Sequence, residues 1–294
     1  MQVFRAARAH LAECPVWAPD GYLTWVDAFA GKVHASALDD PARDRVTAHD
    51  GTVGSVTPVA DGTWVIGLNQ QVWLTDAVGT RSRLLAEIEH AHPDHHLNDA
   101  KADPDGRLVI GSVNEREGTP TAGLFQLTPG GYRTLRGAMQ LSNGLDWSPD
   151  GRTFYFTDST AQLIFSAGYR DGSLTGEKVF ARVDGGVPDG LAVDAEGCVW
   201  SAVWGGGRID QYAPDGRRIG VIRVPAPHVT SLAFGGHDLT TMFITTARDG
   251  LSARELEAAP GSGSLFMVQA SVPGQPARLL DPARFPRDGA RGTS

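Results

Sequence analysis

Several oxygen-bearing side chains stand at one fixed distance before a recurring turn. Each lies eight residues before the turn glycine, and where one copy of the turn has Gly54 the other four have Glu13, Asn98, Asn143 and Asp189. Carboxylates and carboxamides that converge in a crowded place are costly to bury unless a ligand satisfies them. Ca²⁺ or Mg²⁺ takes such oxygen ligands and leaves positions for water or substrate, and the same donors suit Mn²⁺ and accept Zn²⁺ or Fe²⁺. The pattern predicts a site for one divalent cation, provided that the fold brings these residues together.

The turns themselves indicate that fold. Successive turn glycines are 41, 44, 45 and 46 residues apart, which is the length of a four-stranded propeller blade. Pro-Asp-Gly suits a tight turn because proline presets φ, aspartate bonds its own backbone and glycine accepts a positive φ. Five copies of the turn end at Gly21, Gly62, Gly106, Gly151 and Gly197, and a looser sixth copy spans residues 234–238.

We therefore predict an all-β fold, a six-bladed β-propeller with four-stranded antiparallel blades. It forms one domain over residues 1–294, closed by pairing a strand near residues 3–7 with the last blade, and ends in a mobile tail from about residue 282. Residues at equal offsets from the turns form a ring around the axis. The four oxygen-bearing positions begin the first strand of each blade, which is the innermost strand, so they are expected at the mouth of the central channel.

Composition excludes several classes of partner. The formal charge of −8, from 34 acidic and 26 basic side chains, repels nucleic acids and anionic membrane surfaces. Two cysteines cannot form a disulfide framework, and no apolar run resembles a signal peptide or a membrane span. We expect a cytoplasmic protein that is a monomer or a weak homo-oligomer and acts on a small molecule.

Other readings of the same residues were weighed. An isolated Asn-Gly or Asp-Gly pair is ordinary turn chemistry, but four oxygen-bearing residues in one register favour a metal site. The histidines of residues 90–96 would form a metal site only if their loop folded back on itself, so we expect a solvated loop there and retain His96 alone as functional. The sequence has no Gly-x-Ser-x-Gly motif for a serine hydrolase.

At these residues the chain resembles the senescence-marker-protein/gluconolactonase family, the regucalcin-like propellers that hydrolyse sugar lactones, and among them bacterial aldonolactonases. The resemblance covers about residues 8–270 and includes Leu-Ala-Glu-Cys-Pro-Val-Trp at 11–17, Ser-Asn-Gly-Leu-Asp-Trp-Ser-Pro-Asp-Gly at 142–151 and Pro-Asp-Gly-Leu-Ala-Val-Asp at 188–194. It implies that Glu13, Asn143 and Asp189 hold the metal and that Asn98 binds substrate.

Three positions depart from the family pattern. Cys14 and Ala100 stand where the family has glycine, and His96 replaces a substrate-binding arginine. An imidazole has fewer donors than a guanidinium and a pH-dependent charge, so the substrate is expected to differ from the family's usual one. Asn98 and His96 would orient sugar hydroxyl groups, and Glu115 or Glu117 is a further candidate for contacting the substrate.

The implied activity is metal-dependent hydrolysis of an aldonolactone to the aldonic acid, a hydrolase reaction on a carboxylic ester. The cation would polarise the lactone carbonyl and stabilise the oxyanion while water attacks. Asp189 would accept the proton of that water, or a metal-bound hydroxide would attack directly. Two alternatives stay open, a phosphotriesterase that uses the same metal site and a calcium-binding propeller without enzymatic activity.

Overall fold

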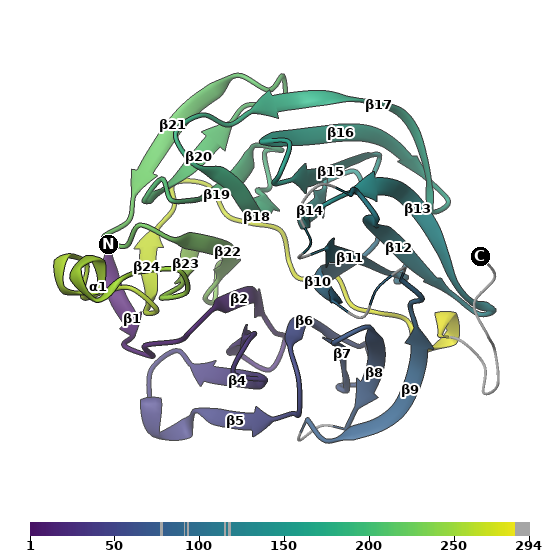
Figure 1. Cartoon of the computed structure of the whole chain (residues 1–294), viewed down its shortest axis with the longest axis horizontal. Coiled ribbons are helices and arrows are strands. Elements are labelled where there is room, and N and C mark those ends of the chain that lie inside the picture. Colours follow the sequence, from purple (N-terminus) through teal and green to yellow (C-terminus); the bar gives the residue numbers. More distant parts are fainter. Residues whose placement is uncertain (77–78, 91, 93, 115, 117–118, 286–294) are drawn as a thin grey trace.

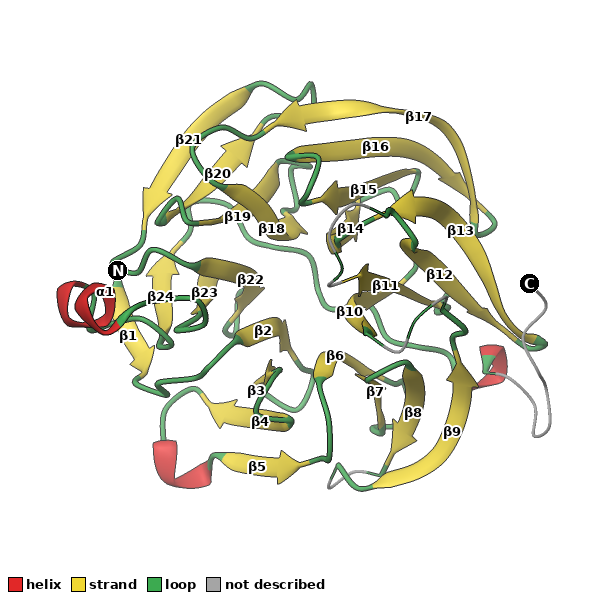
Figure 2. Cartoon of the chain, in the orientation of Figure 1, coloured by secondary structure: helices red, strands yellow, loops and turns green. Residues whose placement is uncertain are grey.

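The molecule is a ring of six four-stranded antiparallel sheets, as the repeat predicts (Figure 1). The computed structural model describes residues 1–76, 79–90, 92, 94–114, 116 and 119–285. Its helices lie at the edge of the ring (Figure 2). They are the α-helix α1 (Ala253–Ala258) and the short 3-10 turns η1 (Pro41–Arg43) and η2 (Pro282–Arg284). Among the described residues, no helix is long and apolar enough to span a membrane.

Each blade begins with its innermost strand. Blade 1 comprises β2 (Ala12–Trp17), β3 (Tyr22–Asp27), β4 (Lys32–Ala37) and β5 (Arg45–Ala48), and blade 2 comprises β6 (Val53–Pro58), β7 (Trp64–Leu68), β8 (Gln71–Thr75) and β9 (Arg81–Glu87). Blade 3 comprises β10 (His95–Ala102), β11 (Leu108–Asn114), β12 (Ala122–Thr128) and β13 (Gly131–Met139), and blade 4 comprises β14 (Ser142–Trp147), β15 (Thr153–Asp158), β16 (Leu163–Arg170) and β17 (Ser173–Arg182). Blade 5 comprises β18 (Val187–Val193), β19 (Val199–Trp204), β20 (Arg208–Tyr212) and β21 (Arg218–Arg223), and blade 6 comprises β22 (Val229–Gly235), β23 (Thr241–Thr246), β24 (Leu265–Gln269) and β1 (Gln2–Arg5).

The two ends of the chain close the ring within blade 6. Strand β1 pairs antiparallel with β24, with Val3 opposite Phe266, which confirms the predicted closure. Apolar side chains from neighbouring blades fill the space between them. Val109 of blade 3, for example, shares a buried cluster with Leu145 and Trp147 of blade 4. Burial on both faces of each blade holds the inner strands at fixed positions around the channel.

After β24 the chain crosses the centre of the ring, and we call residues 270–285 the C-terminal strap (yellow in Figure 1). Its amide at Gly274 donates to the carbonyl of Leu239 over 2.9 Å, and its Leu280, fully buried, pairs with Val59 of blade 2. Order therefore continues past residue 282, where the sequence predicted a mobile tail, because Phe285 is buried in the cluster around blades 2 and 3. Residues 286–294 lie outside the described part of the chain.

Candidate active site in the central channel

The innermost strand of every blade is interrupted at the same level of the ring. The pairing of each inner strand with its neighbour shifts register between Glu13 and Val16 in β2, and at equivalent places in β6, β10, β14, β18 and β22. Such a bulge bends the strand and redirects side chains that a regular strand would point along its own faces. The interruptions hold the predicted residues and their neighbours, namely Glu13, Gly54, Asn98, Asn143 and Asp189, with Thr230 in blade 6.

Glycines let the inner strands approach one another closely here. A Cβ at Gly144 would overlap the Leu191 amide nitrogen, and a Cβ at Gly190 would overlap the Ser231 hydroxyl. Neither glycine has a positive φ, so the close approach of the next blade is what requires glycine at both positions. This explains physically why glycine follows the candidate ligands Asn143 and Asp189.

The structure brings Glu13, Asn143 and Asp189 together in a buried space. Their exposed fractions are 6%, 7% and 4%. Asn143 Nδ2 donates to Ser159 Oγ over 3.3 Å, which turns the amide oxygen Oδ1 away from that partner. Asn143 Oδ1 and Asp189 Oδ1 are both buried and have no hydrogen-bond partner in the described part of the chain. Buried oxygens left without donors are what a cation would satisfy.

Charge at the site is likewise uncompensated. Burial raises the pKa of Glu13 well above its ordinary value, and the negative charges of Asp189 and Asp99 raise it further. Burial also raises the pKa of Asp189, again helped by the charge of Asp99, while hydrogen bonds from Gly190 and Asn143 oppose the rise. These carboxylates repel one another in a medium of low polarity, so positive charge between them would relieve the repulsion.

The donor set decides which cation fits. No group of three or more His, Cys, Asp or Glu side chains among the described residues is arranged to hold a metal ion. A cation at this site would therefore use the carboxamide of Asn143 together with the carboxylates of Glu13 and Asp189. Three oxygen donors of this kind fit a hard divalent cation that completes its shell with water or substrate.

The sequence-based analysis did not identify Asp99 as part of this group. Asp99 follows Asn98 inside the same interruption of β10, and burial raises its pKa to about 6 although the charge of Lys101 opposes the rise. The signal was its place beside Asn98, but a rule of one residue per blade takes the first of the pair and ignores the second. Because a bulge leaves two successive residues unpaired, both can contribute to the channel.

The predicted substrate residues occupy less uniform positions. Asn98 lies at the level of the site, and its Nδ2 donates to the Ser142 carbonyl of blade 4 over 2.9 Å. His96 lies two residues earlier in β10, where its Nδ1 is 3.0 Å from the Leu97 carbonyl oxygen and its ring meets Phe29 edge-on. Glu115 and Glu117 lie outside the described residues.

The expectation of a solvated histidine loop was wrong for two of its members. His95 is 2% exposed, and its Nε2 lies 2.8 Å from the Thr121 hydroxyl. His90 stacks on His95 with ring centroids 4.8 Å apart and meets Phe125 edge-on. The segment is packed rather than solvated because β10 begins at His95 and the preceding loop folds over it.

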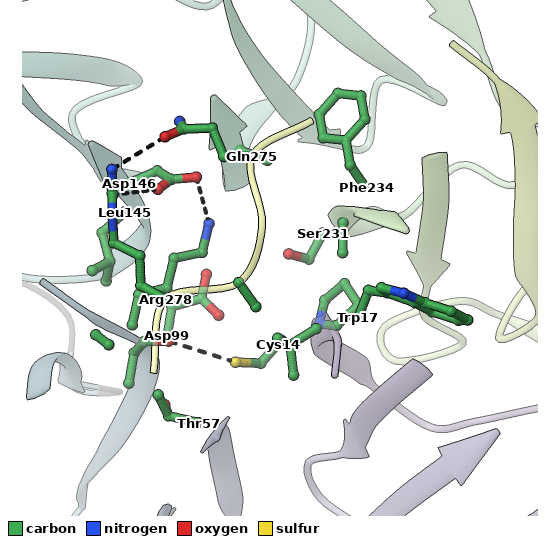
Figure 3. Close-up of a pocket in the computed structure, with 18 of the residues that line it drawn as sticks. Cys14, Trp17, Thr57, Asp99, Leu145, Asp146, Ser231, Phe234, Gln275 and Arg278 are labelled. Atoms are coloured by element: carbon green, nitrogen blue, oxygen red, sulfur yellow. Dashed lines mark hydrogen bonds and ion pairs between the residues drawn. The ribbon is translucent and has the colours of Figure 1, made fainter. Parts of the chain in front are cut away.

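A cavity of about 90 Å³ lies between the site and the C-terminal strap. Its lining begins one residue after Glu13, at Cys14, and includes Asp99 and Asp146, while Gln275 and Arg278 of the strap close the far side (Figure 3). Such a volume holds several water molecules. The carboxylates of the site therefore have polar space on the strap side, and Asp99 lines that space.

A family model described as SMP-30/gluconolactonase/LRE-like region matches residues 11–248. The chain is 32% identical to a 6-deoxy-6-sulfogluconolactonase of Pseudomonas putida over 90% of this chain and 92% of the relative. It is 33% identical to a pentonolactonase of Haloferax volcanii over 90% and 93% of the two chains. A crystal structure of regucalcin from Agrobacterium tumefaciens, described as a calcium-binding protein, superimposes with a TM-score of 0.89 at 29% identity, over 95% of this chain and 96% of that one.

Fold and site thus define a six-bladed propeller that has buried carboxylates at the mouth of its channel. The chain belongs to the SMP-30/gluconolactonase/regucalcin family, the family that the sequence motifs resemble. Members of this family are named as lactonases, which hydrolyse cyclic esters, so the chain belongs among the sugar lactone hydrolases.

Proposed function

We propose that this protein hydrolyses an aldonolactone to the aldonic acid at the site formed by Glu13, Asn143 and Asp189. The observation that carries the proposal is the pair of buried, unpartnered oxygens, Asn143 Oδ1 and Asp189 Oδ1, beside a second buried carboxylate. A site built only for stability would pair these groups with donors. The names of the lactonase relatives support an ester ring as the substrate.

Glu13, Asn143 and Asp189 would hold one divalent cation, which when bound would polarise the lactone carbonyl and stabilise negative charge on its oxygen. Asp189 accepts the proton of the attacking water, because its Oδ1 has no competing partner and burial makes its carboxylate a stronger base than an exposed one. The water oxygen forms a bond to the carbonyl carbon, the ring C–O bond breaks, and the ring oxygen leaves as a hydroxyl group that takes up a proton. One water is consumed and the product acid ionises.

Asn98 and His96 position the sugar hydroxyl groups. The amide of Asn98 is fixed to blade 4 through its Nδ2, so its orientation at the channel mouth is set before substrate binds. His96 stands further out, toward Phe29. Preorganised groups of this kind lower the entropy lost on binding.

Acid release in a pH-stat tests the proposal. Protein stripped with a chelator is assayed on D-xylono-, L-arabinono- and D-gluconolactone and on a 6-sulfo derivative, with Ca²⁺, Mg²⁺, Mn²⁺, Zn²⁺ or Fe²⁺ added singly and spontaneous ring opening subtracted. We expect cation-restored hydrolysis that Asp189→Asn abolishes. Turnover of an organophosphate with no lactone hydrolysed, or cation binding without any turnover, would contradict the proposal.

A further inference from the structure

A continuous arc of ring-bearing side chains runs along the face of the propeller where the candidate site opens. The indole of Trp204 stacks on His228 with centroids 4.0 Å apart and planes 17° apart. His228 Nδ1 lies 2.9 Å from the Asp249 carbonyl oxygen, and the Asp249 carboxylate lies 3.0 Å from His10 Nε2. Each neighbour therefore holds the next one in place.

The arc continues into blades 1 and 3. The ring of His10 lies 5.5 Å from that of Phe29, and Phe29 meets His96 at 6.3 Å with planes 82° apart. Blade 2 contributes only Gly54 at its interruption, where a Cβ would overlap the Leu97 carbonyl oxygen of blade 3. The absence of a side chain at Gly54 lets blades 1 and 3 approach across it.

Strand register places this arc beside the candidate site. Trp204 ends β19 directly opposite Val187, two residues before Asp189. His228 immediately precedes β22, His10 lies three residues before Glu13, and His96 lies two residues before Asn98. The arc thus belongs to the same ends of the same inner strands that carry the site residues.

The side chains of the arc are available to a ligand. Phe29 is 39% exposed, unusually high for a phenylalanine, and Trp204, His228 and His96 are half-buried. Gly205, next to Trp204, has a φ of +73° and nothing within 4 Å of the position of a Cβ, so there is open space beside the indole. An apolar residue exposed in such a setting is typical of a binding surface.

We propose that this arc is the wall against which the sugar ring of the substrate lies, with Trp204 and Phe29 as the residues that set substrate preference. The inference rests on the proposed lactonase function. Aromatic faces receive the C–H groups of a sugar, while imidazole nitrogens bond its hydroxyl groups. The stacked Trp204–His228 pair is rigid, because His228 is held by Asp249, so little entropy is lost when a ring packs on it.

The test compares Trp204→Ala, Trp204→Phe and Phe29→Ala with the control Trp73→Ala, which removes a half-buried indole from β8 on blade 2. Steady-state kinetics are measured on pentono- and hexonolactones. A wall that binds ground state and transition state equally raises KM when removed and leaves kcat unchanged. We expect KM to rise about tenfold in Trp204→Ala and Phe29→Ala, with most of the loss recovered in Trp204→Phe and no change in Trp73→Ala.

A second measurement separates the wall from the chemistry. Calorimetry with 1,5-anhydro-D-glucitol, a cyclic ether that lacks the carbonyl, gives a Kd that we expect Trp204→Ala to raise about tenfold. If the wild type binds this ether through Trp204 but hydrolyses no lactone, the proposed function fails and the wall stands. If lactones are hydrolysed but KM and Kd of the folded Trp204 and Phe29 variants stay within about twofold of wild type, the wall is overturned and the lactonase stands. If the ether does not bind at all, the wall is also overturned.

Discussion

The ammonium group of Lys101 donates to Asp146 Oδ2 over 2.8 Å and so joins the inner strands of blades 3 and 4 beneath the candidate site. The same ammonium donates to the Leu191 carbonyl of blade 5, and Asp146 Oδ2 also accepts from the Val193 amide. Arg278 of the C-terminal strap lies 3.8 Å from the other oxygen of Asp146. One ion pair therefore connects three blades and the strap.

Replacing Lys101 by methionine should lower the free energy of unfolding by about 2 kcal/mol, because it leaves Asp146 in the channel without its main partner. Urea denaturation measures the loss. The double variant Lys101→Met/Asp146→Leu should be more stable than Lys101→Met alone, since it removes the unpaired charge. Arg43→Met, which breaks the exposed pair with Asp39, should have a much smaller effect. A Lys101 variant as stable as that control would show that the pair does not join the blades.

Asp189→Asn should have opposite effects in the absence and presence of cation. Without cation it removes a buried charge that repels Glu13 and Asp99, so the Tm of chelated protein should rise by about 2–4 °C. With cation, the stabilisation seen in wild type should be lost, and hydrolysis should fall about 10³-fold. Differential scanning calorimetry with and without chelator measures both signs. Asp171→Asn, at an aspartate that is 87% exposed, is the charge-matched control and should show neither effect.

Sequence predicted most of this site because equal offsets from a repeated turn mean equal heights in a propeller. It failed where the repeat itself deviates. The turn of blade 6 is irregular, so its ring member was not assigned, and the structure shows Thr230 there, donating to the Ala12 carbonyl over 2.6 Å. Asp99 was missed because nothing in the spacing reveals a bulge. Contacts such as Trp204 with His228 join different blades, and a repeat within each blade carries no information about them.

Cys14 illustrates a backbone constraint that the family pattern suggested without explaining. Its φ is +46°, a region where a side chain costs about 1–2 kcal/mol, which accounts for the glycine common at this position in the family. Cys14→Gly should keep the unfolding free energy within about 1 kcal/mol of wild type, because relief of strain offsets the lost packing. Cys14→Val should cost about 2–3 kcal/mol. Chemical denaturation of both variants, with Cys198→Val as a control, measures this, and equal losses at position 14 would refute the argument.

His90 should make the protein less stable in mild acid. Burial lowers its pKa to about 4, and the nearby His95 lowers it further, whereas an unfolded histidine titrates near about 6.5. Between these values the unfolded chain binds a proton that the native protein does not, so this contribution is complete above pH of about 6.5 and is lost as the pH falls toward 4.

His90→Phe should abolish this dependence. It also removes two buried ring nitrogens that lack partners in the described part of the chain, so stability at pH 7 should rise by about 1 kcal/mol. The advantage over wild type should grow at pH 5, by on the order of 1 kcal/mol after allowing for the half-exposed ring. Urea titrations at both pH values test this, and parallel losses in the two proteins would exclude His90 as the cause.

The C-terminal strap closes the channel only while Gly274 fits against blade 6. A Cβ at Gly274 would overlap the Cβ and ring of Phe234, and its amide donates to the Leu239 carbonyl. Gly274→Ala should therefore displace the strap and cost about 1–3 kcal/mol, whereas Gly137→Ala, which meets no atom closer than 4.0 Å, should be nearly neutral. Displacement should expose Arg278, whose guanidinium now bonds the Ser148 carbonyl and Gln275. Tryptic cleavage after Arg278, followed by mass spectrometry, reports the strap itself, and a Gly274→Ala protein as resistant there as Gly137→Ala would mean that the strap does not depend on this contact.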